Sequence, residues 1–399
     1  MTRLRKILTP LLVVEISIIA ACVAMAAVTF TEVPDSARLE RVAVANSAGP
    51  SLEIGPYVQK VTADAATIMW EANVPSFGEV RVSDGKTETK RRTSRAVRLG
   101  EVRIGGLRPD ALYSYSLTLS SQSKAAARGT FRTLPANPRP IKFIVYGDTR
   151  TSPERHKSVI DAMLRERNLD FVLHTGDLVA DGRNDALWGT EFFTPAGPLM
   201  RSVPFYAVLG NHERDSSNYF RYLSLPGNER WYSFDLPGVH IIGLDSCSRF
   251  DEGSEQRKWL LEDLAEHKDV RWKFVFMHHP VYSSGPHSRV SADGTPKEKA
   301  IREAQSLLPR LAAEFGISAV FAGHDHSYER STRDGVHYIV AGGGGAPSYG
   351  DENARHNPYR KVFFAGLHYC VVAIDGDKGR IVVKTPAGKV LDKVELSRR

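Results

Sequence analysis

The chain has 399 residues, of which 42% are hydrophobic and 25% are charged, and its formal net charge is +7. This composition is ordinary for a folded globular protein and indicates no long disordered tract, while the length predicts two domains. The three cysteines, Cys22, Cys247 and Cys370, form no CxxC pair, which excludes zinc-ribbon and thioredoxin-type sites. Positive charge attracts anions, but the densest basic run, residues 90–92, belongs to no nucleic-acid-binding motif and is interpreted as a solvated face.

Residues 1–27 have the pattern of a segment that directs export. Three basic residues precede an apolar stretch over residues 7–30, and Ala24–Ala26 offers a small-residue cleavage site. An uncleaved membrane anchor stays open, although Glu15 would sit poorly in a bilayer, and so does lipoprotein processing at Cys22. We favour a cleaved signal. Each interpretation places the folded part in the periplasm, outside the cell or anchored at the outer side of the membrane.

A linker over residues 28–49 leads to a β-rich region, residues 50–134. Within it, Leu112–Leu117 alternates apolar-type and polar residues as a half-buried strand does. Short strands separated by turn-rich breaks predict a β-sandwich. The stretch Gly106–Tyr115, closed by Thr130–Thr133, resembles a fibronectin type III-like domain. No catalytic motif falls in this region, so we expect it to be a spacer or a wall beside the active site.

Residues 139–395 alternate strand-like and helix-like stretches. Apolar runs such as Ile141–Tyr146 and helical periods such as Glu255–His267 predict a layered α/β domain, with β-sheets flanked by helices. The strand-like runs end in five polar motifs: Gly147-Asp148, Gly176-Asp177, Gly210-Asn211-His212-Glu213, His278-His279-Pro280 and Gly323-His324-Asp325-His326. Ligands gather at the carboxyl ends of strands in open α/β sheets. We therefore expect the five motifs to converge on one point, with the loop Gly342–Gly345 close to it.

This ordered set of motifs resembles the calcineurin-like metallophosphoesterase family and, with the preceding β-rich region, its purple acid phosphatase branch. Residues Asp325–Arg330 also match that branch. The resemblance implies a phosphatase that hydrolyses small-molecule phosphomonoesters by attack of a metal-bound hydroxide at a two-metal site. Mixed His, Asp and Asn ligands suit two divalent or trivalent ions such as iron, zinc or manganese.

The resemblance assigns six metal ligands in this sequence. Asp177 would bridge the two metals, because neighbouring cations need a shared anionic ligand, and Asp148 and His326 would serve the first metal. The ligands of the second metal would be Asn211, His278 and His324. His279 stays open as the alternative ligand from its motif.

Three further side chains are candidates for catalysis. The resemblance implies that His212 protonates the leaving-group oxygen. Arg150 is a candidate for contacting phosphate, because a planar guanidinium fits phosphate oxygens. His287, in the long loop 281–296, either reaches the site or is a solvated loop residue.

The first-metal position departs from the family pattern. Many metallophosphoesterases have a His where this chain has Arg150, and the purple branch has a Tyr where it has Ala180. Water could replace the missing ligand, or His156 could donate, although a His on a helix is more often exposed. Alternatively, the first metal binds weakly in a degraded enzyme. Without the Tyr, we expect the metal-loaded protein to be colourless.

Three functions therefore stay open. Hydrolysis of phosphomonoesters outside the cytoplasm is favoured. A phosphodiesterase or nucleotidase would use the same residues. A pseudo-phosphatase that binds partners through the β-rich region would fit the altered first-metal position, but the retained ligands count against it. The oligomeric state and any membrane attachment through the N-terminal segment are not readable from the sequence.

Overall fold

The computed structural model describes residues 49–397 except 121 and 123. The predicted export segment and nearly all of the predicted linker lie outside the described residues. Within the described part, no helix is both long enough and apolar enough to cross a membrane. From Pro50 onward the chain forms one compact unit by its contacts, and the proposed boundary between residues 134 and 139 stays a prediction.

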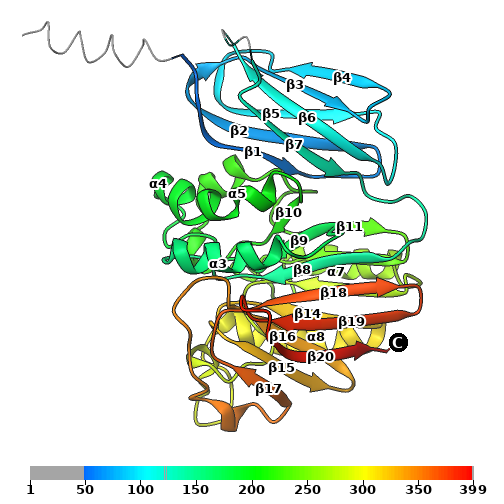
Figure 1. Ribbon diagram of the computed structural model, residues 1–399. Helices are drawn as coiled ribbons and strands as arrows, with labels where there is room; N and C mark the ends of the chain where they lie inside the picture. The colour runs from blue at the N-terminus through cyan, green and yellow to red at the C-terminus, as the bar shows by residue number, and fades with distance from the viewer. Residues whose placement is uncertain (1–48, 121, 123, 398–399) are drawn as a thin grey trace, which may run out of the picture. The chain divides into compact units, whose positions relative to one another are not determined.

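Residues 52–132 form a β-sandwich of two antiparallel sheets (Figure 1). One sheet has the strand order β1-β2-β5, with β1 (Leu52–Gln59), β2 (Ala65–Ser76) and β5 (Val97–Gly105). The other has the order β4-β3-β6-β7, with β3 (Gly78–Ser83), β4 (Glu88–Arg92), β6 (Leu112–Leu119) and β7 (Ala127–Arg132). The predicted N-terminal β-sandwich is confirmed, whereas its fibronectin type III-like character stays a prediction.

Trp70 on β2 fills the interior of this sandwich and is fully buried. Gly78 and Gly100 lie directly against its ring, since a Cβ at these positions would come within 2.0 and 2.1 Å of Trp70 Cζ2. Close packing therefore requires glycine at both positions.

The remaining strands form two mixed sheets (Figure 1). The six-stranded sheet has the order β10-β9-β8-β18-β19-β20, with β8 (Ile141–Tyr146), β9 (Phe171–His174), β10 (Phe205–Ala207), β18 (Tyr369–Asp375), β19 (Lys378–Lys384) and β20 (Val390–Leu396). The seven-stranded sheet has the order β11-β12-β13-β14-β16-β15-β17, with β11 (Tyr232–Leu236), β12 (Val239–Gly243), β13 (Trp272–Phe276), β14 (Ile317–Ala322), β15 (Tyr328–Arg333), β16 (Val336–Ala341) and β17 (Arg360–Phe364). The longer helices are α3 (Pro153–Met163), α5 (Thr194–Met200), α6 (Ser217–Tyr222), α7 (Glu255–Glu266) and α8 (Lys299–Phe315).

Apolar layers hold these sheets and helices together. Phe143 of the six-stranded sheet packs edge-on against Phe274 of the seven-stranded sheet, with ring centroids 5.4 Å apart. On its other face, the seven-stranded sheet packs against α7 and α8, whose buried residues include Leu264 and Leu308. Burial along α8 recurs every three or four residues, as expected for an amphipathic helix. The predicted layered α/β region is confirmed.

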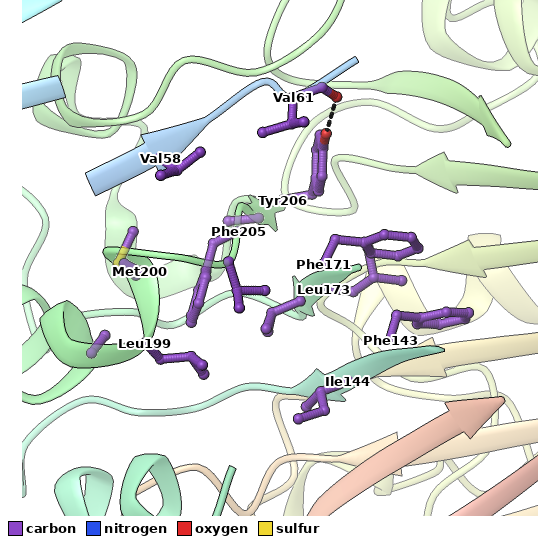
Figure 2. Packing of buried hydrophobic residues seen from close by; sticks show 14 of the residues in the cluster. Val58, Val61, Phe143, Ile144, Phe171, Leu173, Leu199, Met200, Phe205 and Tyr206 are labelled. Atoms are coloured by element: carbon purple, nitrogen blue, oxygen red, sulfur yellow. Dashed lines mark hydrogen bonds between the residues drawn. The ribbon is translucent and has the colours of Figure 1, made fainter. Parts of the chain in front are cut away.

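The core is continuous between the β-sandwich and the α/β region. Figure 2 shows Val58 and Val61, from β1 and the segment after it, beside Phe205 and Tyr206 of β10. The Tyr206 hydroxyl donates a hydrogen bond of 2.9 Å to the Val61 carbonyl oxygen. The sandwich therefore supports the six-stranded sheet, whose strand ends carry three of the five motifs.

Candidate metal centre

Five polar motifs follow the carboxyl ends of five strands and converge. Three come after the parallel neighbours β8, β9 and β10, and two come after the parallel neighbours β13 and β14. The residues they bring together are Asp148, Asp177, Asn211, His278 and His324, joined by His326 from the last motif. This is the convergence that the order of the motifs predicts.

The backbone bends sharply where the side chains crowd. Asp148, Asp177 and His324 have φ values of 58°, 55° and 71°, in the left-handed region that non-glycine residues rarely adopt. A Cβ on Gly210 would lie 2.3 Å from Asp177 Oδ1, and one on Gly323 would lie 2.3 Å from Asp148 Oδ2. Glycine before the ligand motifs thus allows the carboxylates to approach the neighbouring loops. Such backbone strain concentrates at functional sites.

Four donor atoms meet at the position predicted for the second metal. His278 Nε2 lies 2.9 Å from Asn211 Oδ1, 3.1 Å from His324 Nδ1 and 3.4 Å from Asp177 Oδ1. His279 instead places Nδ1 2.9 Å from the Ser246 hydroxyl oxygen. The geometry therefore favours His278 over His279 as the residue that faces this cluster.

The hydrogen bonds of the two imidazoles fix which nitrogen faces the cluster. His278 Nδ1–H donates to the Thr175 carbonyl oxygen at 2.9 Å, and His324 Nε2–H donates to Glu298 Oε2 at 3.0 Å. Burial lowers the pKa of both rings, that of His324 well below its usual value, and so favours their neutral forms. Two nitrogen lone pairs and an amide oxygen then face one another without a proton between them. A cation removes this repulsion, so the donor set fits a metal.

The position predicted for the first metal has three donors. Ligand atoms of Asp148, Asp177 and His326 lie within 4.8 Å of one another. His326 Nδ1–H donates to the Pro347 carbonyl oxygen at 2.8 Å, which leaves Nε2 facing Asp148 Oδ1 at 3.6 Å. Burial and the charge of Asp177 raise the pKa of Asp148 well above its usual value. A cation between the two buried carboxylates would allow both to ionise, so these residues also fit a metal.

Arg150 lies against the first-metal donors. Its Nε donates to Asp177 Oδ2 at 3.2 Å, and its Nη2 donates to His326 Nε2 at 3.3 Å. Burial opposes ionisation of Asp177, but its neighbours His278, His212 and Arg150, including the hydrogen bond from the His212 backbone N–H, lower its pKa to about 2. Asp177 is therefore the permanently charged member of the pair of carboxylates.

His156 does not join this cluster. The expectation that it is exposed on its helix is wrong, because its side chain is fully buried. One ring nitrogen lies 3.0 Å from the Glu191 carbonyl oxygen and the other 3.1 Å from the Tyr146 hydroxyl oxygen. Both nitrogens are thus engaged inside the core, and His156 cannot replace the missing ligand.

His212 borders the cluster without being part of the donor sets. Its Nδ1–H donates to the Ala180 carbonyl oxygen at 2.7 Å, and its Nε2 lies 3.9 Å from Asp177 Oδ2. Its backbone N–H donates to Asp177 Oδ1 at 2.9 Å. The imidazole is 23% exposed, so it can meet a ligand from solvent.

His287, which the sequence left open, and Gly342, from the loop predicted to lie near the centre, both lie close to the cluster. His287 reaches from its loop to within 3.9 Å of the His324 ring, measured between centroids. Gly342 lies close to Asp148, since a Cβ there would come within 2.9 Å of Asp148 Oδ2.

Three residues that support the cluster were not predicted from the sequence. Buried Glu213 accepts hydrogen bonds from the backbone N–H groups of Gly210 and Asp177, at 2.6 and 2.9 Å, and its place beside Asn211 and His212 was the available signal. Glu298 bonds His324, and Tyr349 stacks on His326 with ring centroids 4.0 Å apart. Neither Glu298 nor Tyr349 lies in a motif.

The comparisons with known proteins agree with this geometry. The family model described as calcineurin-like phosphoesterase matches residues 141–328. Probable purple acid phosphatase 20 of Arabidopsis thaliana is 32% identical over 304 residues, covering 68% of this chain and 67% of that protein. Purple acid phosphatase 21 of the same plant is 30% identical, covering 62% of this chain and 58% of that protein. The fold is similar to that of purple acid phosphatase PPD1 from yellow lupin, with a TM-score of 0.71, 16% identity, and coverage of 86% of this chain and 74% of that chain.

The family match falls on the strands and motifs that build the donor cluster, and the similarity to the first of these relatives extends over 68% of this chain. On this evidence, the chain belongs to the calcineurin-like phosphoesterases, hydrolases of phosphoric esters, in their purple acid phosphatase-like branch.

Proposed function

We propose that this chain is an exported phosphatase that hydrolyses phosphomonoesters at a two-metal centre. The observation that carries the proposal is that His324 Nδ1 and Asn211 Oδ1 both lie within 3.1 Å of His278 Nε2, beside Asp177. Export rests on the sequence pattern of residues 1–27 alone.

The residues divide into two ligand sets that share Asp177. Asp148 and His326 would complete the first set. Asn211, His278 and His324 would complete the second set. Two bound ions of iron, zinc or manganese would lower the pKa of a coordinated water and neutralise charge on the phosphate oxygens.

His212 is suited to protonate the leaving-group oxygen. Its Nδ1–H is held by the Ala180 carbonyl oxygen, so Nε2 is the atom that takes up a proton and delivers it. When Nε2 is protonated, Asp177 Oδ2 at 3.9 Å stabilises the imidazolium charge. General acids of this kind work when they reach the leaving group within hydrogen-bond distance.

Arg150 is suited to hold the phosphate. Its guanidinium is 15% exposed and lies between Asp177 and His326, so it borders both the metal ligands and the solvent. A planar fork of N–H donors matches two phosphate oxygens.

The test is elemental analysis of the purified protein followed by a panel of monoesters, diesters and nucleotides. Bound metal together with fastest turnover of an aryl monoester would support the proposal. Preference for diesters or nucleotides would show that the proposed substrate class is wrong and that these esters are the substrates instead. If the chain binds no metal and turns over no ester, it is a binding protein and not a phosphatase.

A further inference from the structure

The two halves of the candidate metal centre are unequal. Four side chains supply donors at the second position: Asp177, Asn211, His278 and His324. Among the residues that the structure describes, three supply donors at the first position: Asp148, Asp177 and His326. Ala180 and His156 add none, because the first has no donor side chain and the second is engaged in the core.

The first position also contains a cationic side chain. Arg150 donates to two of the three donor residues, through Nε to Asp177 Oδ2 at 3.2 Å and through Nη2 to His326 Nε2 at 3.3 Å. His326 Nε2 can accept this bond because its Nδ1–H is already donated to the Pro347 carbonyl oxygen. The guanidinium therefore occupies Asp177 Oδ2 and the lone pair of His326 Nε2, both of which a first metal would need as ligands.

The guanidinium is held in place by more than these two contacts. Its Nη1 lies 3.3 Å from the Thr151 hydroxyl oxygen, and the side chain is only 15% exposed. A fixed, planar fork loses little freedom when it bonds two acceptors at once. Within the described residues, no Lys or Arg side chain hydrogen-bonds to Asn211, His278 or the Nδ1 atom of His324.

We propose that Arg150 is a built-in competitor for the first metal. Its guanidinium occupies Asp177 Oδ2 and His326 Nε2 until a cation displaces it, so the two metals bind in sequence and with unequal affinity. The second position fills first and tightly, and the first fills last and weakly. This inference rests on the proposed two-metal function and concerns how that centre is loaded.

Displacement also connects metal loading to phosphate binding. A guanidinium released from Asp177 and His326 remains on the loop after β8, at the edge of the centre. Its donors then become available to phosphate oxygens. Arg150 would thus contact phosphate only when the first position is filled.

The experiment is a titration of metal-stripped protein with zinc, followed by calorimetry and by elemental analysis after dialysis. The wild-type chain should keep one zinc through dialysis and bind a second at least about 10-fold more weakly, a difference of about 1.4 kcal/mol. Arg150→Ala should tighten the weak step about 10-fold and leave the tight step unchanged. Arg150→His, which supplies a ligand in place of a competitor, should tighten the weak step further.

A charge control separates competition from long-range repulsion. Arg214 is exposed and follows Asn211 by three residues, and within the described part of the chain its side chain hydrogen-bonds to none of the metal-donor residues. Arg214→Asn removes the same charge and suits the left-handed backbone there, with φ of 55°. It should leave both zinc affinities within about twofold.

The outcomes distinguish this inference from the proposed function. Two zinc ions of equal affinity in the wild-type chain would overturn the inference and leave the proposed function standing. An unchanged weak step in both Arg150 variants, or an equal effect of Arg214→Asn, would overturn it as well. A wild-type chain that binds no zinc at all would overturn the proposed function itself.

Discussion

Glu298 offers a direct way to weaken the second metal position without touching a ligand. Its carboxylate accepts hydrogen bonds from His324 Nε2–H at 3.0 Å and from His287 Nδ1–H at 2.8 Å. The first of these bonds holds the His324 ring so that Nδ1 faces His278. A carboxylate behind a ligating imidazole fixes the ring and raises its basicity. Glu298→Ala should therefore weaken zinc binding at the second position.

The expected loss can be placed within a range. Removing such an outer partner generally costs 10–100-fold in metal affinity, about 1.4–2.7 kcal/mol. Glu298 is 33% exposed, so water can take over part of the hydrogen bond to His324 and the loss should fall near the lower end, about 10–30-fold. The side chain makes no capping hydrogen bond at the start of α8, so the helix should be preserved.

The assay is competition for zinc between the protein and a chromophoric chelator, with Glu303→Ala as the matched control. Glu303 lies on the same helix but pairs with Lys299 at 2.9 Å, away from the centre. The control should bind zinc like the wild-type chain. If Glu298→Ala also bound zinc with wild-type affinity, the orientation of His324 by Glu298 would have no energetic importance and the reasoning would be refuted.

Three other predictions follow from the same structure. His212→Ala should lower turnover about 10²–10⁴-fold for esters with poor leaving groups while metal content stays unchanged, and equal turnover of such esters by both proteins would remove His212 from the chemistry. Iron-loaded protein should show no strong visible absorption band, because Ala180 stands where a tyrosinate would be needed, and a purple solution would contradict this. Burial lowers the pKa of His240, but hydrogen bonds of 2.8 Å to both Asp235 and Asp263 raise it more strongly. The pKa of His240 therefore lies above its usual value. The stabilisation by His240 should therefore be complete below about pH 6.5 and be lost as pH rises through its folded-state pKa. Urea unfolding across pH should show this fall for the wild-type chain and a smaller fall for His240→Gln, and identical pH profiles would contradict it.

The sequence carried enough information to predict the layers and the convergence of the motifs. Apolar runs that end in Gly-Asp, Gly-Asn-His or Gly-His-x-His place polar side chains at strand ends, and parallel strands bring those ends to one edge. Asp148, Asp177 and Asn211 follow neighbouring strands of one sheet for this reason. Alternation along Leu112–Leu117 likewise sufficed to predict a half-buried strand of the sandwich.

Contacts between distant loops were not predictable in the same way. Glu298 comes 26 residues before its partner His324, and nothing local marks either residue as a partner of the other. The helical period around His156 shows that a helix forms but not that this face packs against Tyr146 and the Glu191 carbonyl group. The contact between Arg150 and His326 depends on two strand ends in different sheets, so only the folded chain reveals it.

The most direct test of the metal centre is a crystal structure of zinc-soaked protein with anomalous diffraction data. We expect the strongest anomalous peak among His278 Nε2, His324 Nδ1 and Asn211 Oδ1, and a weaker peak between Asp148 and His326. Zinc bound only elsewhere, for example at the separate group Asp235, His240 and His267, would contradict the assignment of this cluster as the metal centre.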